Sequence, residues 1–304
     1  MNSTFLKNSL GSKETAEKVA WRVQQVVPAY KRFLEKHGLK LGEPFERLRQ
    51  SDKESYALAY PFEELLADDY EETLTIFRSS GSSGNPFYWP QLKSASRSAP
   101  AVLRAFLESA FAVHQKKTLA IVGLNLGGWI GGESFSWILK NMAIDTAYPF
   151  YVFSPGSHHE EIIEMVCKMN PFVDQIVLFL VPSAIAHFHL KASQLKQSLP
   201  FEKLRYIVTG EPFPESLRAS LQSSAGLEQD TPFMFSVYGS ADTGSLGVES
   251  LATVALRKLL YRNNALASSL GIVTAKAVRT IDAGHAPSHR VDPQTARVAC
   301  ESDF

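Results

Sequence analysis

The feature that most constrains the fold is a repeated alternation of short apolar segments with helical patterns between residues 118 and 237. A strand is expected at residues 175–181, because the run 176–181 is continuously apolar, as in a strand that is buried on both faces of a sheet. Further strands are expected at residues 118–122, 148–153, 204–208 and 233–237. Because helical patterns separate these strands, neighbours should run parallel, with helices covering both faces. The sequence therefore predicts an α/β fold with a largely parallel sheet flanked by helices.

The composition limits the kinds of partner and compartment. The chain has 304 residues and 45% hydrophobic content, enough for a sizeable core. Lys plus Arg equals Asp plus Glu at 31 each, so no overall basic field attracts nucleic acid. The two cysteines, Cys167 and Cys300, form no disulfide framework. No apolar run is long enough for a signal peptide or a membrane span. These features predict a soluble, cytoplasmic protein with no nucleic-acid or membrane partner.

The pattern along the chain predicts one large domain over residues 1–270 and an irregular tail over residues 271–304. The domain is expected to start with helices at 13–70 and to continue as α/β layers at 73–262. A helix over residues 14–27 should end at Pro28, which then opens a second helix ending near Gly38. The tail has no sustained period and is expected to be poorly ordered.

Two capping boxes are predicted from Ser and Glu residues spaced three apart. Ser51 with Glu54 would open a short N-terminal helix, and Ser157 with Glu160 would open a helix after the strand at 148–153.

A Ser/Gly-rich loop at residues 79–86 is the strongest local sign of ligand binding. It lies between an expected strand at 73–77 and a helix that begins near Lys93. Backbone N–H groups and serine hydroxyls in such a loop can surround one anion, as nucleotide phosphates require. The spacing matches neither the Walker loop nor the dinucleotide fingerprint. A flexible linker is the alternative, although the aromatic residues at 87–89 argue against a solvated one.

Two further loops follow expected strands, at residues 210–212 and 238–244. Ligands of parallel α/β sheets bind at the carboxyl ends of strands. The Ser/Gly-rich loop and these two loops are therefore expected to converge on one site.

A glycine-rich turn at residues 123–132 connects a strand to a helix without the dinucleotide spacing. Close backbone packing beside a ligand cavity and plain steric need both explain it. Trp129, Phe135 and Trp137 nearby fit an aryl pocket or ordinary core. The histidines at 158, 159, 187 and 189 fit solvated helix positions better than a metal site, because no Cys or Asp completes a tetrahedral set.

Taken in order, four segments resemble the large N-terminal domain of the adenylate-forming superfamily, and within it phenylacetate-CoA ligases and coenzyme F390 synthetases. Residues 26–33 are similar to a "VPFYR" segment and residues 80–86 to an "SGTTGKP" loop. Residues 204–212 resemble the "GGEPL" type of segment, and residues 238–242 resemble "YGxTE". The resemblance covers about residues 20 to 260.

The resemblance implies that a carboxylic acid, aromatic acids included, attacks the α-phosphate of ATP to give an acyl-adenylate, usually followed by thioester formation with coenzyme A. It assigns the polyphosphate to Ser80, Gly81, Ser82, Ser83 and Gly84. It assigns the adenine side of the nucleotide site to Gly210, Glu211, Pro212, Tyr238, Gly239 and Ser240, with the Tyr238 ring stacked on the base. Asp242 would hold Mg²⁺ and is the one residue assigned a catalytic role.

The chain departs from the family pattern at several positions. Asn85 replaces the loop lysine, Ala241 replaces a hydroxyl residue, and Asp242 is one methylene shorter than the usual Glu. The sequence ends at Phe304, before the region where the family carries a lid domain with its catalytic lysine. We therefore expect a truncated adenylate-forming ligase-like protein that is impaired in thioester formation. The alternative is a non-catalytic module that binds a nucleotide or acyl-adenylate. A homodimer and a separate lid-bearing polypeptide both stay open as partners.

Overall fold

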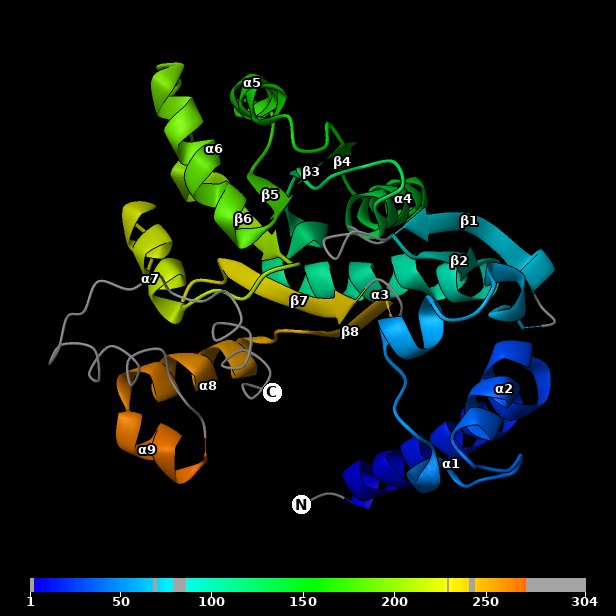
Figure 1. Ribbon diagram of the computed structural model, residues 1–304. Coiled ribbons are helices and arrows are strands. Elements are labelled where there is room, and N and C mark those ends of the chain that lie inside the picture. The colour runs from blue at the N-terminus through cyan, green and yellow to red at the C-terminus, as the bar shows by residue number, and fades with distance from the viewer. Residues whose placement is uncertain (1–2, 68–69, 79–85, 229, 241–243, 272–304) are drawn as a thin grey trace, which may run out of the picture. The chain divides into compact units, whose positions relative to one another are not determined.

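The computed structural model describes residues 3–67, 70–78, 86–228, 230–240 and 244–271 (Figure 1). Contacts divide the chain into unit 1, residues 1–97, and unit 2, residues 98–304. The boundary falls inside helix α3 (Lys93–Phe111).

Unit 1 begins with two consecutive helices, α1 (Ser3–Val26) and α2 (Pro28–Lys36). Pro28 occupies the first position of α2, where its missing N–H breaks no helical hydrogen bond. The predicted break between the helices is confirmed. The buried Gln24 side chain of α1 accepts hydrogen bonds from the backbone N–H groups of Gly42 and Glu43, at 2.8 and 3.1 Å. This contact fastens the segment after α2 to α1.

The first predicted capping box is displaced by one residue. Asp52, not Ser51, caps a short π-helical turn (Lys53–Ala57), and its Oδ1 accepts from the Ser55 N–H at 2.7 Å. A carboxylate is as effective an N-cap as a serine hydroxyl, and a sequence with both side by side does not decide between them.

Unit 1 also contains a two-stranded antiparallel sheet of β1 (Thr73–Arg78) and β2 (Tyr88–Leu92). β1 confirms the strand expected at 73–77. β2 was not predicted, because Pro90 lies within it, opposite Ile76. Proline is tolerated where the neighbouring edge is unpaired. The Ser/Gly-rich loop therefore connects two antiparallel strands and does not follow a strand of the parallel sheet, which corrects one premise of the predicted convergence.

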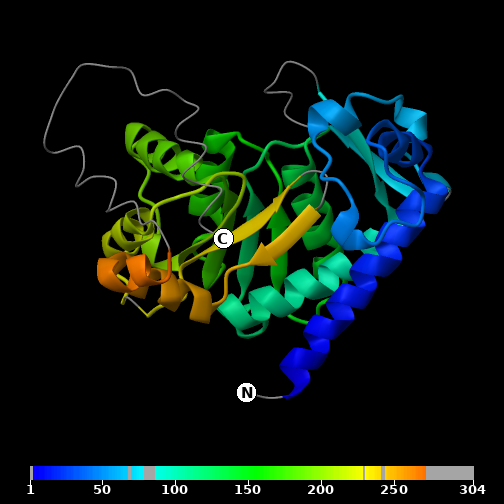
Figure 2. The ribbon, with the colours of Figure 1, turned by 60° about the horizontal axis from the view of Figure 1, so that its bottom comes forward.

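Unit 2 is built on a sheet with strand order β4-β3-β5-β6-β7-β8. Neighbours from β4 to β7 pair in parallel, and β8 pairs antiparallel with β7, as the two yellow strands of Figure 2 show. The predicted fold class is confirmed. The strands are β3 (Thr118–Val122), β4 (Phe150–Phe153), β5 (Gln175–Leu180), β6 (Leu204–Val208), β7 (Met234–Ser240) and β8 (Gly244–Val248).

Helices cover both faces of this sheet, and each face has its own apolar core. Helices α5 (His159–Met169), α6 (Pro182–Gln194) and α7 (Glu215–Ser224) pack over the face that carries Ile176 and Leu178. Helices α3, α4 (Ile130–Asp145) and α8 (Leu251–Arg262) pack over the face that carries Val177 and Phe179. Every residue of β5 is buried, as its continuous apolar run predicts.

Several local features of unit 2 differ from the sequence expectation. The second predicted capping box is wrong: α5 begins at His159, so His158 and not Ser157 is its N-cap, and no side chain caps it. A capping box not foreseen opens α8, where Ser250 and Thr253 bond to each other's backbone N–H. β8 and α9 (Asn264–Ser269) were also not predicted.

Short 3₁₀ turns complete the described secondary structure: Phe45–Arg47, Phe62–Glu64, Tyr70–Glu72, Val113–Gln115 and Phe201–Lys203. Among the described residues, the helices are too short or too polar to cross a membrane.

Candidate functional site at the carboxyl ends of the strands

The loops after β6 and β7 leave the sheet at the same edge, because the two strands are parallel neighbours. Val208, the last residue of β6, pairs with Ser236 in β7. Gly210, Glu211 and Pro212 follow β6, and Tyr238, Gly239 and Ser240 form the end of β7. The fold thus brings two of the three predicted loops to adjacent strand ends.

The loop after β6 is held against the start of α6. The Glu211 Oε2 atom accepts a hydrogen bond from the Ser183 N–H in the first turn of α6, at 3.1 Å. Gly210 has φ +83°, a left-handed conformation that favours glycine, and an added Cβ would lie 3.5 Å from Val181. Residues 210–212 are exposed at the sheet edge.

The end of β7 presents Tyr238, of which 52% is exposed. Tyr238 pairs with Gly247 of β8, and the register shifts between Tyr238 and Gly239. A Cβ added to Gly239 would lie 2.3 Å from the Gly244 carbonyl oxygen, so a side chain at 239 would separate β7 from β8. The glycine therefore serves strand pairing, and the tyrosine ring stands at the exposed edge.

The remaining predicted site residues lie outside the described residues: Ser80, Gly81, Ser82, Ser83, Gly84 and Asp242, together with Asn85 and Ala241. The Ser/Gly-rich loop also belongs to unit 1, whereas the other two loops belong to unit 2. The convergence of all three loops stays a prediction.

Close packing explains two glycines of the turn at 123–132. A Cβ at Gly123 would lie 2.4 Å from Leu180 Cδ2, and one at Gly132 would lie 2.0 Å from the Asn125 carbonyl oxygen. The turn is closed by Glu133, whose Oε2 accepts from the Gly127 N–H at 3.3 Å. Steric need accounts for both close-packed glycines without a ligand.

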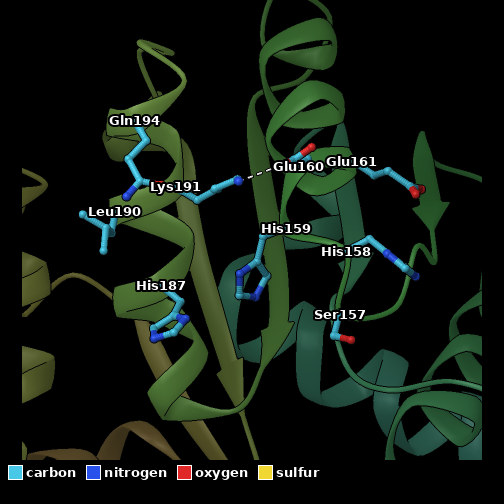
Figure 3. Close-up of a pocket in the computed structure, with 9 residues that line it drawn as sticks. All are labelled: Ser157, His158, His159, Glu160, Glu161, His187, Leu190, Lys191 and Gln194. Carbon is cyan, nitrogen blue, oxygen red and sulfur yellow. Dashed lines mark ion pairs between the residues drawn. The ribbon is translucent and has the colours of Figure 1, made fainter.

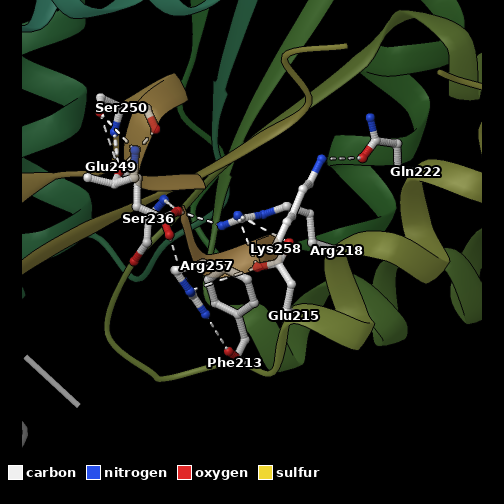
Figure 4. Close-up of polar contacts among 10 residues, drawn as sticks. Phe213, Glu215, Arg218, Gln222, Ser236, Glu249, Ser250, Arg257 and Lys258 are labelled. Atoms are coloured by element: carbon white, nitrogen blue, oxygen red, sulfur yellow. Dashed lines mark hydrogen bonds and ion pairs between the residues drawn. The ribbon is translucent and has the colours of Figure 1, made fainter. Parts of the chain in front are cut away.

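A buried ion cluster lies beside the loop after β6 (Figure 4). We use this name for Glu215, Arg218, Glu249 and Arg257. Arg218 Nη1 lies 3.1 Å from Glu215 Oε2, and Arg218 Nη2 lies 2.5 Å from Glu249 Oε2. Arg257 Nη1 donates to Glu249 Oε1 at 2.6 Å. Glu249 thus uses both carboxylate oxygens, one for each arginine.

Burial shapes the electrostatics of the cluster. The Arg218 side chain is 1% exposed and that of Glu215 is 5% exposed. Desolvation lowers the pKa of Arg218, against the opposing effect of its carboxylate partners. Desolvation likewise raises the pKa of Glu215, against the opposing effect of Arg218 and Arg257. Burying these charges is costly, and removing one partner would leave the others uncompensated.

Both arginines of the cluster also contact Phe213, the aromatic residue that follows Pro212 in the loop after β6. Phe213 is 8% exposed, and the guanidinium carbons of Arg257 and Arg218 lie 4.8 and 5.1 Å from its ring centre. Arg257 Nη2 also donates to the Phe213 carbonyl at 3.0 Å. Cation–π contacts of this kind are strongest when desolvated.

Sequence reasoning missed the buried ion cluster and Phe213. Glu215 and Arg218 are spaced three apart on an expected helix, which is the one available signal. Nothing in the sequence links them to Glu249, which lies 31 residues beyond Arg218.

A separate open cavity of about 590 Å³ lies between the N-terminal part of α5 and α6 (Figure 3). The rings of His159 and His187 lie between the two helices with centres 6.5 Å apart, whereas His158 is directed away from them. Lys191 Nζ pairs with Glu160 Oε1 at 2.6 Å across the same gap.

Burial, and secondarily His187, lowers the pKa of His159 in this cavity. Within the described ranges, no group of three or more His, Cys, Asp or Glu side chains is arranged to hold a metal.

Comparisons with known proteins identify the architecture. No protein-family model matches the chain, and no curated protein matches it. Among solved structures, 2-hydroxyisobutyryl-CoA ligase with 2-HIB-AMP and CoA in the thioesterification state matches with a TM-score of 0.59 and 15% identity, over 80% of this chain and 51% of the other. The chain shares the fold of the matched half of this ligase. An open conformation of that ligase matches with a TM-score of 0.55 and 15% identity, over 75% of this chain and 52% of the other. The chain thus spans about half the length of the ligase.

Proposed function

We propose that this protein binds an adenine nucleotide at the carboxyl ends of β6 and β7 and acts as an adenylate-forming ligase-like enzyme on a small carboxylic acid. One observation carries the proposal: the adjacent ends of β6 and β7 present residues 210–212, which we call the Gly210 loop, and the exposed Tyr238 ring. The fold that presents them is shared with a ligase solved with an acyl-adenylate. Ligands of parallel sheets bind at this edge.

In the proposed complex, the Tyr238 ring stacks on the adenine, and the backbone of Gly210, Glu211 and Pro212 lines the edge of the base. The exposure of Tyr238 and of the loop supports these roles. By resemblance, residues 80–84 surround the polyphosphate and Asp242 carries Mg²⁺. The phenylacetate-CoA ligase type of subfamily, and aromatic acids as substrates, belong to the same proposal.

In the proposed reaction, a carboxylate oxygen attacks the α-phosphorus, the bond to the β-phosphate bridging oxygen breaks, and pyrophosphate leaves. Such chemistry depends mostly on positioning and on neutralising phosphate charge. Transfer of the acyl group to coenzyme A would follow as a second step.

Calorimetric titration with AMP and ATP tests the nucleotide site. We expect binding by the unaltered chain and about tenfold weaker binding after Tyr238→Ala, because stacking of a base on an aromatic ring contributes about 1–3 kcal/mol. Tyr151→Ala is the matched control, since Tyr151 is 44% exposed and lies in β4, which is separated from β6 in the sheet by β3 and β5. Absence of binding at millimolar nucleotide would overturn the proposal.

Pyrophosphate exchange separates catalysis from binding alone. Labelled pyrophosphate should enter ATP only when a suitable acid is added, and phenylacetate and 2-hydroxyisobutyrate are the first acids to try. The alternative function, a non-catalytic nucleotide or acyl-adenylate binding module, is favoured by Asn85 in place of the loop lysine and Ala241 in place of a hydroxyl residue. Nucleotide binding without exchange for any acid would establish that alternative.

A further inference from the structure

The buried ion cluster connects the segments on which the proposed nucleotide site stands. Glu215 and Arg218 belong to α7, Arg257 belongs to α8, and Glu249 follows β8 directly. Glu249 is the shared member, because Arg218 binds its Oε2 at 2.5 Å and Arg257 binds its Oε1 at 2.6 Å. The Glu249 side chain is 11% exposed and that of Arg218 is 1% exposed, so solvent screens their contact little, whereas Arg257 is 37% exposed.

Glu249 also fixes β7 directly. The Ser236 N–H donates to Glu249 Oε2 at 2.7 Å, and the Glu249 N–H donates to the Ser236 carbonyl at 2.9 Å. Ser236 is two residues before Tyr238 on the same strand. The position of the Tyr238 end of β7 therefore depends on a side chain outside the strand.

Arg257 extends this connection to the other strand end. Its Nη1 holds Glu249, while its Nη2 donates to the Phe213 carbonyl at 3.0 Å and its guanidinium covers the Phe213 ring. Phe213 follows Pro212 directly. A continuous path of charge-assisted contacts thus runs from the Gly210 loop through Arg257 and Glu249 to β7 (Figure 4).

We propose that Glu249 is a positioning residue that locks the loop after β6 and the end of β7 into one rigid wall for the adenine nucleotide. This role rests on the proposed function of the same edge. Glu249 does not touch the nucleotide in this account; it sets the separation of the two segments that do.

Three substitutions in the full chain test the proposal. Glu249→Gln keeps the shape but removes the charge that both arginines share. Arg257→Lys keeps a cation beside Glu249 but lacks the second N–H that reaches Phe213, because the ammonium is not a fork. Glu108→Gln is the matched control: it makes the same chemical change in α3, where Glu108 accepts from Tyr148 at 2.9 Å.

Hydrogen exchange measures the connection without any nucleotide. In Glu249→Gln we expect the backbone amide hydrogens of residues 209–214 and 234–240 to exchange about tenfold faster or more. The contacts shared through Glu249 are weakened in this variant, so local opening of either segment costs less free energy. In Arg257→Lys only residues 209–214 should speed up, because Glu249 still holds Ser236. Glu108→Gln should change neither segment. Unchanged exchange at either 209–214 or 234–240 in Glu249→Gln would overturn the proposal. If Glu249→Gln does not fold, Glu249→Asp, which keeps the charge but shortens the side chain, takes its place with the same expected and contradicting results.

AMP titration of the same proteins tests the consequence for binding. We expect the Kd of AMP to rise about fivefold or more in Glu249→Gln and Arg257→Lys, measured well below their melting temperatures, and to stay constant in Glu108→Gln. If Glu249 only stabilised the fold, its substitution would lower the melting temperature and leave the Kd of AMP unchanged. That result would overturn the positioning role of Glu249 but not the proposed nucleotide site. Absence of AMP binding by the unaltered chain would overturn the proposed function, and this role with it.

Discussion

The two charged clusters of unit 2 contain ion pairs of similar length that differ in burial. In the buried ion cluster, the paired side chains of Arg218, Glu215 and Glu249 are 1%, 5% and 11% exposed, and only Arg257, at 37%, reaches solvent. In the cavity between α5 and α6, those of Lys191 and Glu160 are 38% and 66% exposed. The ion-pair distances, 2.5 and 2.6 Å, are nearly equal. The length of an ion pair therefore does not indicate how much it contributes to stability. Burial decides how much free energy of unfolding is lost when each pair is broken.

The largest effect is expected from Arg218→Met. Methionine fills much of the same space but leaves Glu215 and Glu249 buried without their main cation. Breaking a buried ion pair in this way costs about 3–5 kcal/mol of the free energy of unfolding, which urea denaturation measures. Lys191→Met removes the exposed ion pair with Glu160 in the cavity between α5 and α6, and it should leave the urea midpoint equal to that of the unaltered chain within experimental error. Equal effects of the two substitutions would contradict the comparison.

A smaller effect is expected from Phe213→Leu, which tests the aromatic part of the buried ion cluster. Leucine remains apolar but offers no ring face to Arg218 and Arg257, so we expect a loss of about 1–3 kcal/mol in the free energy of unfolding. Phe172→Leu is the control, because Phe172 is 65% exposed. If Phe213→Leu is as mild as this control, the two guanidinium contacts at Phe213 are not stabilising.

The smallest effect is expected in the pH dependence of stability, through His159 in the cavity between α5 and α6. Burial and His187 lower the pKa of His159 in the folded chain, so the folded state resists its protonation. The resulting stability is fully present above the unfolded pKa of about 6.5 and is lost as the pH falls through the lower folded value. The urea midpoint should therefore fall on acidification below about pH 6.5, and His159→Asn should reduce that fall. An identical pH profile for the variant would contradict the assignment.

The sequence is sufficient for the parallel part of the fold. β3 and β6 have the expected bounds, and β5 is one residue shorter than expected, because short apolar runs rich in β-branched residues between helical patterns indicate strands buried on both faces. β8 was missed because Gly244 and Gly247 remove the β-branched alternation on which strand prediction depends. β2 was missed because of Pro90, which an edge position tolerates.

The candidate site was only partly predictable. The strand-end positions of Gly210 and Tyr238 follow from local pattern, since a strand and the loop after it are contiguous in sequence. The buried ion cluster joins residues from three separate segments, and its charges look like solvated helix faces when each segment is read alone. Charge pairing across such separations is a property of the tertiary fold.

Photolabelling with 8-azido-ATP tests the central claim most directly. An adenine bound at the carboxyl ends of β6 and β7 places the azido group beside the Gly210 loop and Tyr238. We predict that mass spectrometry finds the label in the peptides containing residues 209–214 or 234–240, and that excess ATP or AMP prevents it. Labelling that ATP does not compete, or competed labelling confined to other peptides such as the α5 and α6 cavity, would contradict the account.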